Sequence, residues 1–390
     1  MKVYVAACGI GLGHVGRCVP IVQKLREKGA EILFSTYFEG LEYVKKTDFP
    51  FVEAPALGVK VKPDGTIDFK QTAINPGPFI ASFMILEQIR AEIEALQRFS
   101  PNVAVSDSRA STLIAAKILG IPTVCILNQF QVIIPRKKRF LRLSKLADAA
   151  VLALIGKIWT SSNRILIPDF PQPYTISTGN LRIPKAYQKR VQLIGPILPV
   201  QPEELPEKKA LRRKLGLDLE KPLIFAPISG PVKERAYLLK ALMKIFSDFP
   251  EEYQVVMSMG YPSSAATPIR RGNFILYRWV PNRFEYLKAC DLVISRAGHG
   301  TLTHSICYGK PIIVVPTPSH TEQLNNARKV VKLGVARMVE QEILSKDVLL
   351  YNIERVLNDE KITEKAKLLQ EKVSKYNGLE AAAEAVLEMA

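Results

Sequence analysis

Short runs of apolar residues alternate with longer stretches of helical periodicity in the first part of the chain. Residues 3–8 (VYVAAC) form an apolar run beside a glycine, a pattern typical of a buried strand. Residues 14–29 (HVGRCVPIVQKLREKG) have helical spacing and end in Lys and Gly, and residues 31–36 (EILFST) are apolar again. The same order returns within residues 102–127. Strands that alternate with helices predict a parallel sheet with helices on both faces.

A proline-rich segment divides this pattern into two halves. Residues 196–206 (PILPVQPEELP) contain four prolines and little that could pack, so we predict a linker there. Strand and helix patterns restart at 222–229 and continue beyond it. We therefore predict an α/β protein of two Rossmann-like doubly wound domains, 1–195 and 207–390. In such sheets, ligands bind outside the carboxyl ends of the strands.

The composition of the chain limits the kinds of partner and compartment that we expect. Lys and Arg number 54 against 37 Asp and Glu, and the formal net charge of +17 favours an anionic partner such as nucleic acid, an anionic membrane or a phosphorylated substrate. The five cysteines are scattered and form no CxxC pair, which argues against a disulfide framework and suits a reducing cytoplasm. We see no signal-peptide pattern at the start and no apolar run long enough for a spanning helix.

Glycine-rich turns follow several predicted strands. Residues 9–17 (GIGLGHVGR) stand between the first strand and helix, where backbone N–H groups and a helix N-terminus favour an anion. The spacing departs from the GxGxxG dinucleotide fingerprint, and strand 31–36 does not end in an acidic residue that would hold a ribose. Residues 295–305 (SRAGHGTLTHS) and 228–231 (ISGP) form similar turns. We expect a helix to begin near Thr301 and a pyrophosphate to bind there.

Three of the four histidines lie within residues 296–327. His299 and His304 are five residues apart, so they do not share a helix face, and no Cys stands at ligand spacing. We therefore expect no metal site. His320 lies in the loop PTPSHTEQ, where it either lines a ligand site or is a hydrogen-bonded structural residue.

The fourth histidine, His14, follows the first glycine turn at a strand's carboxyl end. A general base fits that place, and a structural histidine is the alternative. Asp107 ends the strand VAVSD at the same predicted edge, so it could orient His14 and stabilise its charged form. Asp107 could also cap the helix that follows, and the two roles are compatible.

The segments 11–17 (GLGHVGR) and 291–327 (DLVISRAGHGTLTHSICYGKPIIVVPTPSHTEQLNNA) resemble GT-B glycosyltransferases of the MurG and UDP-glycosyltransferase type, which are similar to glycosyltransferase family 28. The resemblance covers nearly the whole chain. It implies two Rossmann-like domains facing a cleft, with the last helix packing back on the N-terminal domain. It also implies an inverting, metal-independent hexosyltransferase that moves a sugar from a nucleotide-diphosphate donor, here a UDP-sugar, to a hydroxyl acceptor.

The resemblance also implies roles for single residues. His14 matches the catalytic histidine and Asp107 its acidic partner. The positions that the glycine turns and the resemblance together assign to the donor are Gly13, Ser229, Gly230, Val280, Arg296, Gly298, His299, Gly300, Thr301, His304, Glu322 and Gln323. The family carries a Glu at the position of His304, where it holds both ribose hydroxyls; an imidazole offers no pair of acceptor oxygens. No DxD motif occurs, so we expect neither a metal nor another cofactor.

A basic stretch precedes an apolar one in residues 135–159 (PRKKRFLRLSKLADAAVLALIGKIW). Such a segment could rest on an anionic membrane, or it could be a core helix with a solvated basic end. The candidate membrane-contact residues are Arg136, Lys137, Lys138, Arg139, Arg142 and Lys145. We expect a cytoplasmic protein, peripheral on the membrane, with a lipid-phosphate-linked acceptor. The basic residues lack interleaved aromatics, so nucleic acid is not expected.

Three other functions fit parts of this pattern. GxGHVxRC near the start is similar to nucleotide-sugar hydrolases of the sialic-acid-like sugar pathway, in which water replaces the acceptor. Non-hydrolysing epimerases share the fold. A non-enzymatic protein that binds nucleotide sugars or polyanions is the third alternative.

Overall fold

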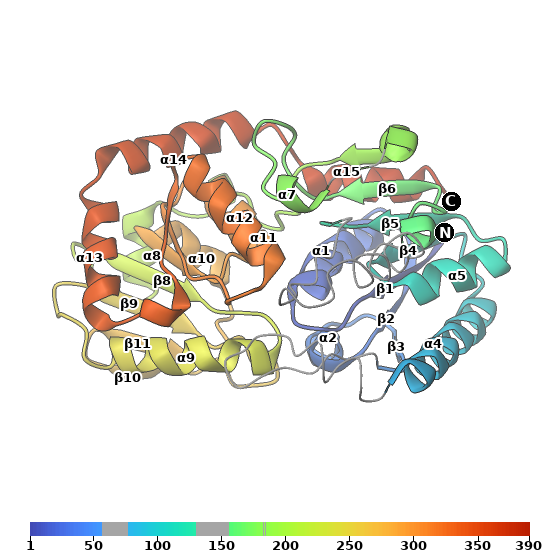
Figure 1. Ribbon diagram of the computed structural model, residues 1–390, viewed down its shortest axis with the longest axis horizontal. Helices are drawn as coiled ribbons and strands as arrows, with labels where there is room; N and C mark the ends of the chain where they lie inside the picture. The colour runs from blue at the N-terminus through green and yellow to red at the C-terminus, as the bar shows by residue number, and fades with distance from the viewer. Residues whose placement is uncertain (57–76, 130–155, 182, 184) are drawn as a thin grey trace, which may run out of the picture. The chain divides into compact units, whose positions relative to one another are not determined.

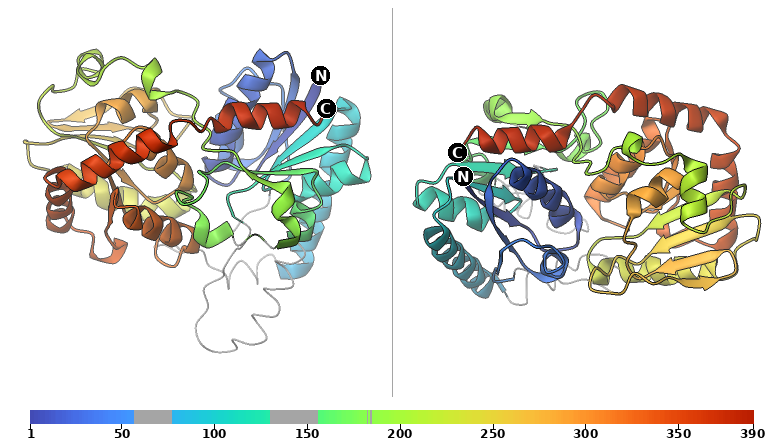
Figure 2. Two further views of the ribbon diagram at one scale, coloured as in Figure 1. Left: turned by 90° about the horizontal axis from the view of Figure 1, so that it is seen from above. Right: turned by 180° about the vertical axis from the view of Figure 1, so that it is seen from behind.

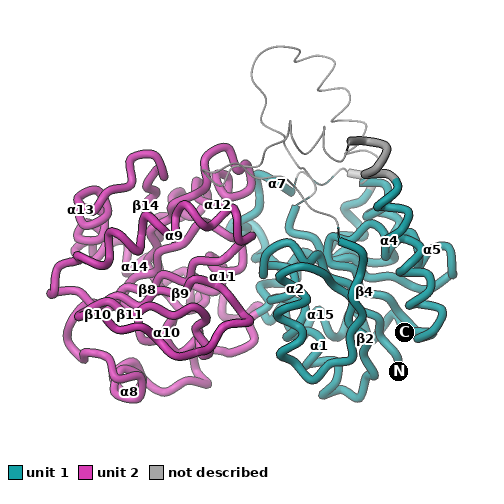
Figure 3. The backbone as a smooth tube through the Cα atoms, turned by 90° about the horizontal axis from the view of Figure 1, so that it is seen from below, with its two compact units in different colours: residues 1–61, 67–197, 377–390 teal, residues 62–66, 198–376 magenta. Residues whose placement is uncertain are grey.

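The structure, a computed structural model, describes residues 1–56, 77–129, 156–181, 183 and 185–390 (Figure 1). The described chain forms two compact units (Figure 3). The first contains the chain up to Ile197 together with Asn377–Ala390, and the second runs from Leu198 to Tyr376. The proline-rich segment 196–206 thus spans the change of unit, and its Pro202–Glu204 forms a short 3₁₀ helix, η2, in the second.

The first unit is built on a parallel sheet. Among its described residues the strand order is β3-β2-β1-β4-β5-β6-β7, and every neighbouring pair is parallel. The strands are β1 Lys2–Ala7, β2 Glu31–Thr36, β3 Phe51–Glu53, β4 Val103–Asp107, β5 Thr123–Ile126, β6 Arg164–Ile167 and β7 Val191–Leu193. The helices are α1 Gly13–Glu27, α2 Phe38–Val44, α4 Gly77–Phe99, α5 Ala110–Ile118, α7 Thr178–Leu181 and α15 Gly378–Leu387, with the 3₁₀ helix η1 at Lys185–Arg190.

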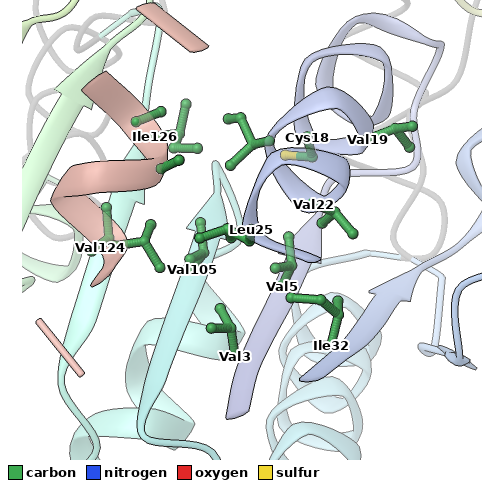
Figure 4. Close-up of a cluster of buried hydrophobic side chains, with 14 of the residues drawn as sticks. Val3, Val5, Cys18, Val19, Val22, Leu25, Ile32, Val105, Val124 and Ile126 are labelled. Carbon is green, nitrogen blue, oxygen red and sulfur yellow. The ribbon is translucent and has the colours of Figure 1, made fainter. Parts of the chain in front are cut away.

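Alternation along the strands explains why helices cover both faces of this sheet. Val3 and Val5 of β1 face the core beneath α1, whereas Tyr4 and Ala6 face the core beneath α4 and α5. Figure 4 shows the first of these cores, where Cys18, Val19, Val22 and Leu25 of α1 lie over β1, β2, β4 and β5. Full burial of each such aliphatic side chain contributes about 1.5–3 kcal/mol.

The C-terminal helix belongs to the first unit. α15 lies against α1 (Figure 2) and adds Ala382, Ala383 and Val386 to the core of Figure 4. Glu380 of α15 forms ion pairs with Lys24 of α1 and with Lys28, the residue that follows α1. Gly378, at its start, approaches the chain so closely that a Cβ there would lie 2.1 Å from the carbonyl oxygen of Gly195. This contact holds α15 against the end of the first unit's main segment.

The second unit repeats the plan with one difference. Its strand order is β10-β11-β9-β8-β12-β13-β14 among the described residues. The strands are β8 Leu223–Pro227, β9 Gln254–Ser258, β10 Ile269–Arg271, β11 Phe274–Tyr277, β12 Leu292–Ser295, β13 Ile312–Val314 and β14 Ala336–Met338. The helices are α8 Lys208–Lys214, α9 Val232–Phe246, α10 Arg283–Ala289, α11 His299–Cys307, α12 Thr321–Lys332, α13 Lys346–Leu357 and α14 Glu360–Val373, with the 3₁₀ helix η3 at Gln341–Ile343.

Strand β10 corrects the expectation of a purely parallel sheet. It pairs antiparallel with β11 at the edge and is exposed along its length. Its sequence, IRR, has no apolar run, so hydrophobic patterning could not reveal it. Backbone pairing with β11 across a short turn forms it instead.

Both sheets have a point where the strand order reverses. In the first unit, β1 leads to β2 on one side and lies beside β4 on the other. In the second, β8 leads to β9 and lies beside β12. Ligands of doubly wound sheets bind at the carboxyl ends of the strands at such points. None of the helices that the structure describes is both long and apolar enough to span a membrane.

Candidate active site and nucleotide loops

The reversal point of the first unit brings His14 and Asp107 together. β1 and β4 are paired so that Ala7 lies opposite Asp107, the last residue of β4. The loop after β1 continues into α1, which begins at Gly13 and places His14 in its first turn. Nδ1 of His14 lies 2.7 Å from Oδ1 of Asp107.

Close backbone packing fixes the glycine loop before His14. A Cβ on Gly9 would lie 1.7 Å from the carbonyl oxygen of Tyr37, so no side chain fits there. The amide of Gly40 donates to the carbonyl of Gly9 at 3.2 Å. Gly11 has φ +69°, a conformation that glycine adopts without strain. The loop is therefore held by the segment that opens α2.

Asp107 is fully buried, whereas about a quarter of the His14 side chain is exposed. Burial raises the pKa of Asp107, but the charges of Arg17 and His14 and their hydrogen bonds lower it more. The net pKa is well below the ordinary aspartate value. An ionised carboxylate only accepts hydrogen bonds, so Nδ1 of His14 carries the proton between the two residues. The other ring nitrogen, Nε2, is then the basic atom.

Arg17 is the residue of this site that the sequence analysis did not identify. Its Nε lies 2.5 Å from Oδ2 of Asp107, and its Nη2 lies 2.5 Å from Oδ1. This fork holds both carboxylate oxygens. Arg17 also stands three residues after His14 on α1, so Nη2 lies 3.0 Å from Nδ1 of the ring. The spacing HVGR, which puts both residues on one helix face, was the available signal.

The capping role considered for Asp107 is not what the structure shows. α5 begins at Ala110, and its N-cap residue is Arg109, which makes no side-chain capping hydrogen bond. Ser108 follows Asp107 with φ +61°, an unusual conformation for a residue other than glycine. Cys18 adds a contact of 3.4 Å from its Sγ to Oδ2 of Asp107. The carboxylate is thus turned toward α1.

The reversal point of the second unit carries two of the predicted donor loops. Residues 228–231 follow β8 and lead into α9, and residues 296–298 follow β12 and lead into α11. α11 begins at His299 with Gly298 as N-cap, so the expected start near Thr301 is wrong by two residues. Because α11 begins at His299, Gly300 and Thr301 lie within its first turn, where backbone N–H groups have no partner in the helix. The side chain of His299 is buried.

Arg296 connects these loops from the inside. Its Nη1 donates to the carbonyl of Ser229 at 3.2 Å, and its Nη2 donates to the hydroxyl of Thr317. Gly230 has φ +112°, and a Cβ there would lie 2.6 Å from Nη1 of Arg296. Arg296 is buried and lies 3.6 Å from the carboxylate of Glu234. Its guanidinium binds the protein's own loops.

Glu322 and Gln323, two of the predicted donor residues, lie at the start of α12, and Gln323 makes hydrogen bonds within the fold. Oε1 of Gln323 accepts a hydrogen bond of 2.8 Å from the amide of Thr317. His320 is the N-cap of α12, and its Nδ1 accepts from the amide of Gln323 at 3.4 Å. Of the two roles considered for His320, the structural one is therefore present. Glu322 lies half-buried in the first turn.

Comparison with known proteins finds glycosyltransferases that match this chain. Residues 233–381 match the glycosyltransferase family 28 C-terminal domain. An uncharacterized glycosyltransferase of Methanosarcina mazei is 29% identical over 98% of this chain and 97% of its own. The chain is therefore similar to GT-B glycosyltransferases of the family 28 type.

Other relatives extend the match over both units. A UDP-N-acetylglucosamine–N-acetylmuramyl-(pentapeptide) pyrophosphoryl-undecaprenol N-acetylglucosamine transferase of Bacillus thuringiensis is 25% identical over 94% of this chain and 93% of its own. The crystal structure of the calicheamicin glycosyltransferase superposes with a TM-score of 0.67 at 18% identity, covering 100% of this chain and 98% of that one. The predicted fold class is confirmed.

Two further residues that were expected to bind the donor have partners inside the second unit. The amide of Val280, expected near the nucleotide base, donates to the hydroxyl of Ser258 at 3.3 Å, so it is engaged. His304 lies edge-on to Phe284, with ring centroids 5.3 Å apart. Phe284 in turn stacks on Tyr308. His304 is therefore set in an aromatic cluster and is half-buried.

The expected membrane contact and the expected absence of a metal site remain. The candidate membrane-contact residues, Arg136, Lys137, Lys138, Arg139, Arg142 and Lys145, lie in the segment 130–155, which the structure does not describe. Within the described part of the chain, no three His, Cys, Asp or Glu side chains are grouped so that they could hold a metal ion.

Proposed function

We propose that this glycosyltransferase transfers the sugar of a UDP-sugar to a hydroxyl acceptor with inversion of the anomeric centre and without a metal. The observation that carries the proposal is the His14–Asp107 pair at a reversal point of the sheet. Its Nδ1 proton is directed at a buried carboxylate, which leaves Nε2 of a partly exposed ring as the base. Gly13, the first residue of α1, directly precedes His14.

The proposed reaction is one displacement. Nε2 of His14 takes the proton of the acceptor hydroxyl as its oxygen forms a bond to the anomeric carbon. The bond between that carbon and the diphosphate oxygen breaks, and the nucleoside diphosphate leaves with the electron pair. Attack opposite the leaving group inverts the configuration. Asp107 stabilises the imidazolium that forms.

The second unit supplies the support for the donor. The helix N-termini of α9 and α11 adjoin the reversal point, and each favours an anion. Two arginines, Arg235 and Arg296, are buried beneath these loops with one carboxylate, Glu234, 3.6 Å from Arg296. The resulting positive potential would favour a diphosphate and its departure, which is the role that a divalent cation has in other transferases.

We also propose a lipid-linked acceptor and a position on the cytoplasmic face of a membrane. The Bacillus relative is named for a pyrophosphoryl-undecaprenol acceptor. The basic stretch at 135–159 and the formal net charge of +17 suit a surface that bears phosphates.

A donor panel tests the transfer. UDP-, TDP- and GDP-sugars are incubated with the full chain, with and without a membrane lipid extract, and nucleoside diphosphate release is followed. Release that requires the extract, with a product of inverted configuration by NMR, supports the proposal. Release of equal rate without any acceptor indicates hydrolysis, and binding without release indicates a non-enzymatic protein.

Metal independence has its own test. Turnover is measured after dialysis against EDTA, and we expect an unchanged rate. A loss of turnover that magnesium or manganese restores would contradict the proposal.

A further inference from the structure

Arg17 shares one carboxylate with the proposed base. Oδ1 of Asp107 lies 2.7 Å from Nδ1 of His14 and 2.5 Å from Nη2 of Arg17. Oδ2 lies 2.5 Å from Nε of Arg17. The arginine thus makes two hydrogen bonds to Asp107 and the histidine makes one.

Burial makes this sharing important. Asp107 is fully buried, and only 12% of the Arg17 side chain is exposed. Charges in such surroundings interact more strongly than in water. A buried aspartate with His14 as its one cationic partner would strongly favour the imidazolium. A histidine held as imidazolium cannot accept a proton from an acceptor hydroxyl.

The other groups around the pair do not balance the charge of Asp107. Cys18 of α1, Cys125 of β5 and Cys8, which follows β1, lie near Asp107, and burial raises the pKa of each thiol, so all three are neutral. Glu39 of α2 lies 3.4 Å from the amide of Gly11 and is itself acidic. The compensating cation is Arg17.

We propose that Arg17 is a positioning residue that neutralises Asp107 and holds it in register with His14, so that the ring is oriented by the carboxylate yet remains able to accept a proton. This inference rests on the proposed function of His14. Two features of the geometry support it. The fork fixes the plane of the carboxylate. The one-turn spacing places His14 and Arg17 on the same face of α1.

The test compares substitutions that separate charge from hydrogen bonding. Arg17→Met removes both, Arg17→Gln keeps donor groups without the charge, and Arg17→Lys keeps the charge. Arg26→Met is the matched control, because Arg26 is on the same helix in an exposed ion pair with Asp48. Thermal unfolding of each full-length variant establishes that it folds, and Arg17→Gln replaces Arg17→Met if the latter does not.

Two measurements are made on each variant. The first is the pH dependence of turnover at saturating donor. The second is NMR titration of isotope-labelled histidine, in which His14→Ala identifies the His14 signal among the four histidines. For Arg17→Met and Arg17→Gln we expect the acid limb of the pH–turnover profile and the NMR titration of His14 to move to higher pH by about one unit or more. Turnover near neutral pH should fall about tenfold and recover in alkaline solution. Arg17→Lys should return both curves toward those of the wild type, and Arg26→Met should change neither.

A turnover loss of equal size at every pH, with an unshifted His14 titration, would overturn the inference and leave Arg17 a structural residue. An Arg17→Lys shift as large as that of Arg17→Met would also overturn it. Failure of the proposed function is distinguishable: if His14→Ala retains turnover, His14 is not the base, whatever the Arg17 variants do. If His14→Ala is inactive and the Arg17→Met curves are unshifted, only the inference on Arg17 fails.

Discussion

The two reversal points use polar side chains in opposite ways. In the first unit, His14 is partly exposed and a buried carboxylate and guanidinium point toward it. In the second, the side chains of Arg296 and Gln323 turn inward and bind neighbouring loops. The difference suits the two proposed tasks. Moving a proton needs a side chain of suitable proton affinity, whereas holding a diphosphate can be left to backbone N–H groups that the side chains keep in place.

The largest effect should come from breaking the interior of the second unit. Arg296→Met leaves Glu234 buried without its cation, and we expect the free energy of unfolding to fall by about 3–5 kcal/mol. Burial already raises the pKa of Glu234, against the lowering influence of His320 and Arg296. The folded state of the variant therefore binds more protons than the unfolded state, and its deficit should shrink as pH falls.

Chemical denaturation at several pH values measures this effect. The double variant Arg296→Met with Glu234→Gln is the control, because it removes the uncompensated charge and should regain part of the loss. A deficit that does not change with pH and is not relieved by the second substitution would show that the ion pair is not its source.

The next largest effect concerns turnover. His14→Ala removes the proposed base, and turnover should fall by roughly a hundredfold or more. Nucleotide binding, measured by calorimetry, should change little, because the donor loops belong to the other unit. Undiminished turnover would make His14 a structural residue.

A smaller effect is expected at the orienting carboxylate. Asp107→Asn still accepts a hydrogen bond from His14 through its amide oxygen, but it no longer stabilises the imidazolium. We expect turnover to fall about tenfold, less than for His14→Ala. The ionised carboxylate of Asp107 also stabilises the folded protein, because the pKa of Asp107 is lowered on folding. That stabilisation is complete above the unfolded pKa of about 4 and is lost as pH falls below it.

Steady-state kinetics and acid unfolding together check this prediction. The difference in the free energy of unfolding between the wild type and Asp107→Asn should become smaller below about pH 4. An unaltered rate with reduced stability would assign Asp107 to the fold alone.

The smallest effect is expected at His304. If the donor is a uridine nucleotide, His304→Glu offers two acceptor oxygens to a ribose, and binding should tighten by about tenfold at most. Titration of UDP, GDP, TDP and CMP against both proteins measures it. Sharply weaker UDP binding would show that His304 recognises another group, and His304→Gln separates loss of the ring from gain of charge.

Much of the fold followed from patterning. The apolar runs at 3–8 and 31–36 correspond to β1 and β2, and the segment of helical spacing at 14–29 corresponds to α1. Edge strand β10 could not be predicted, because its three residues, IRR, form no apolar run, are all exposed and depend on β11 for pairing. The start of α11 was misplaced, because a glycine at the N-cap and a glycine inside the first turn look alike in sequence.

The sequence by itself determined which residues stand at the carboxyl ends of strands, because hydrophobic period and glycine position are local properties. It thereby indicated His14, Asp107 and the loops after β8 and β12. Only the tertiary structure decided what each side chain contacts. Arg17 meets Asp107 across 90 positions of chain, and Arg296 meets Ser229 across 67. Such partners are set by strand order and by burial of charge, which no local pattern encodes.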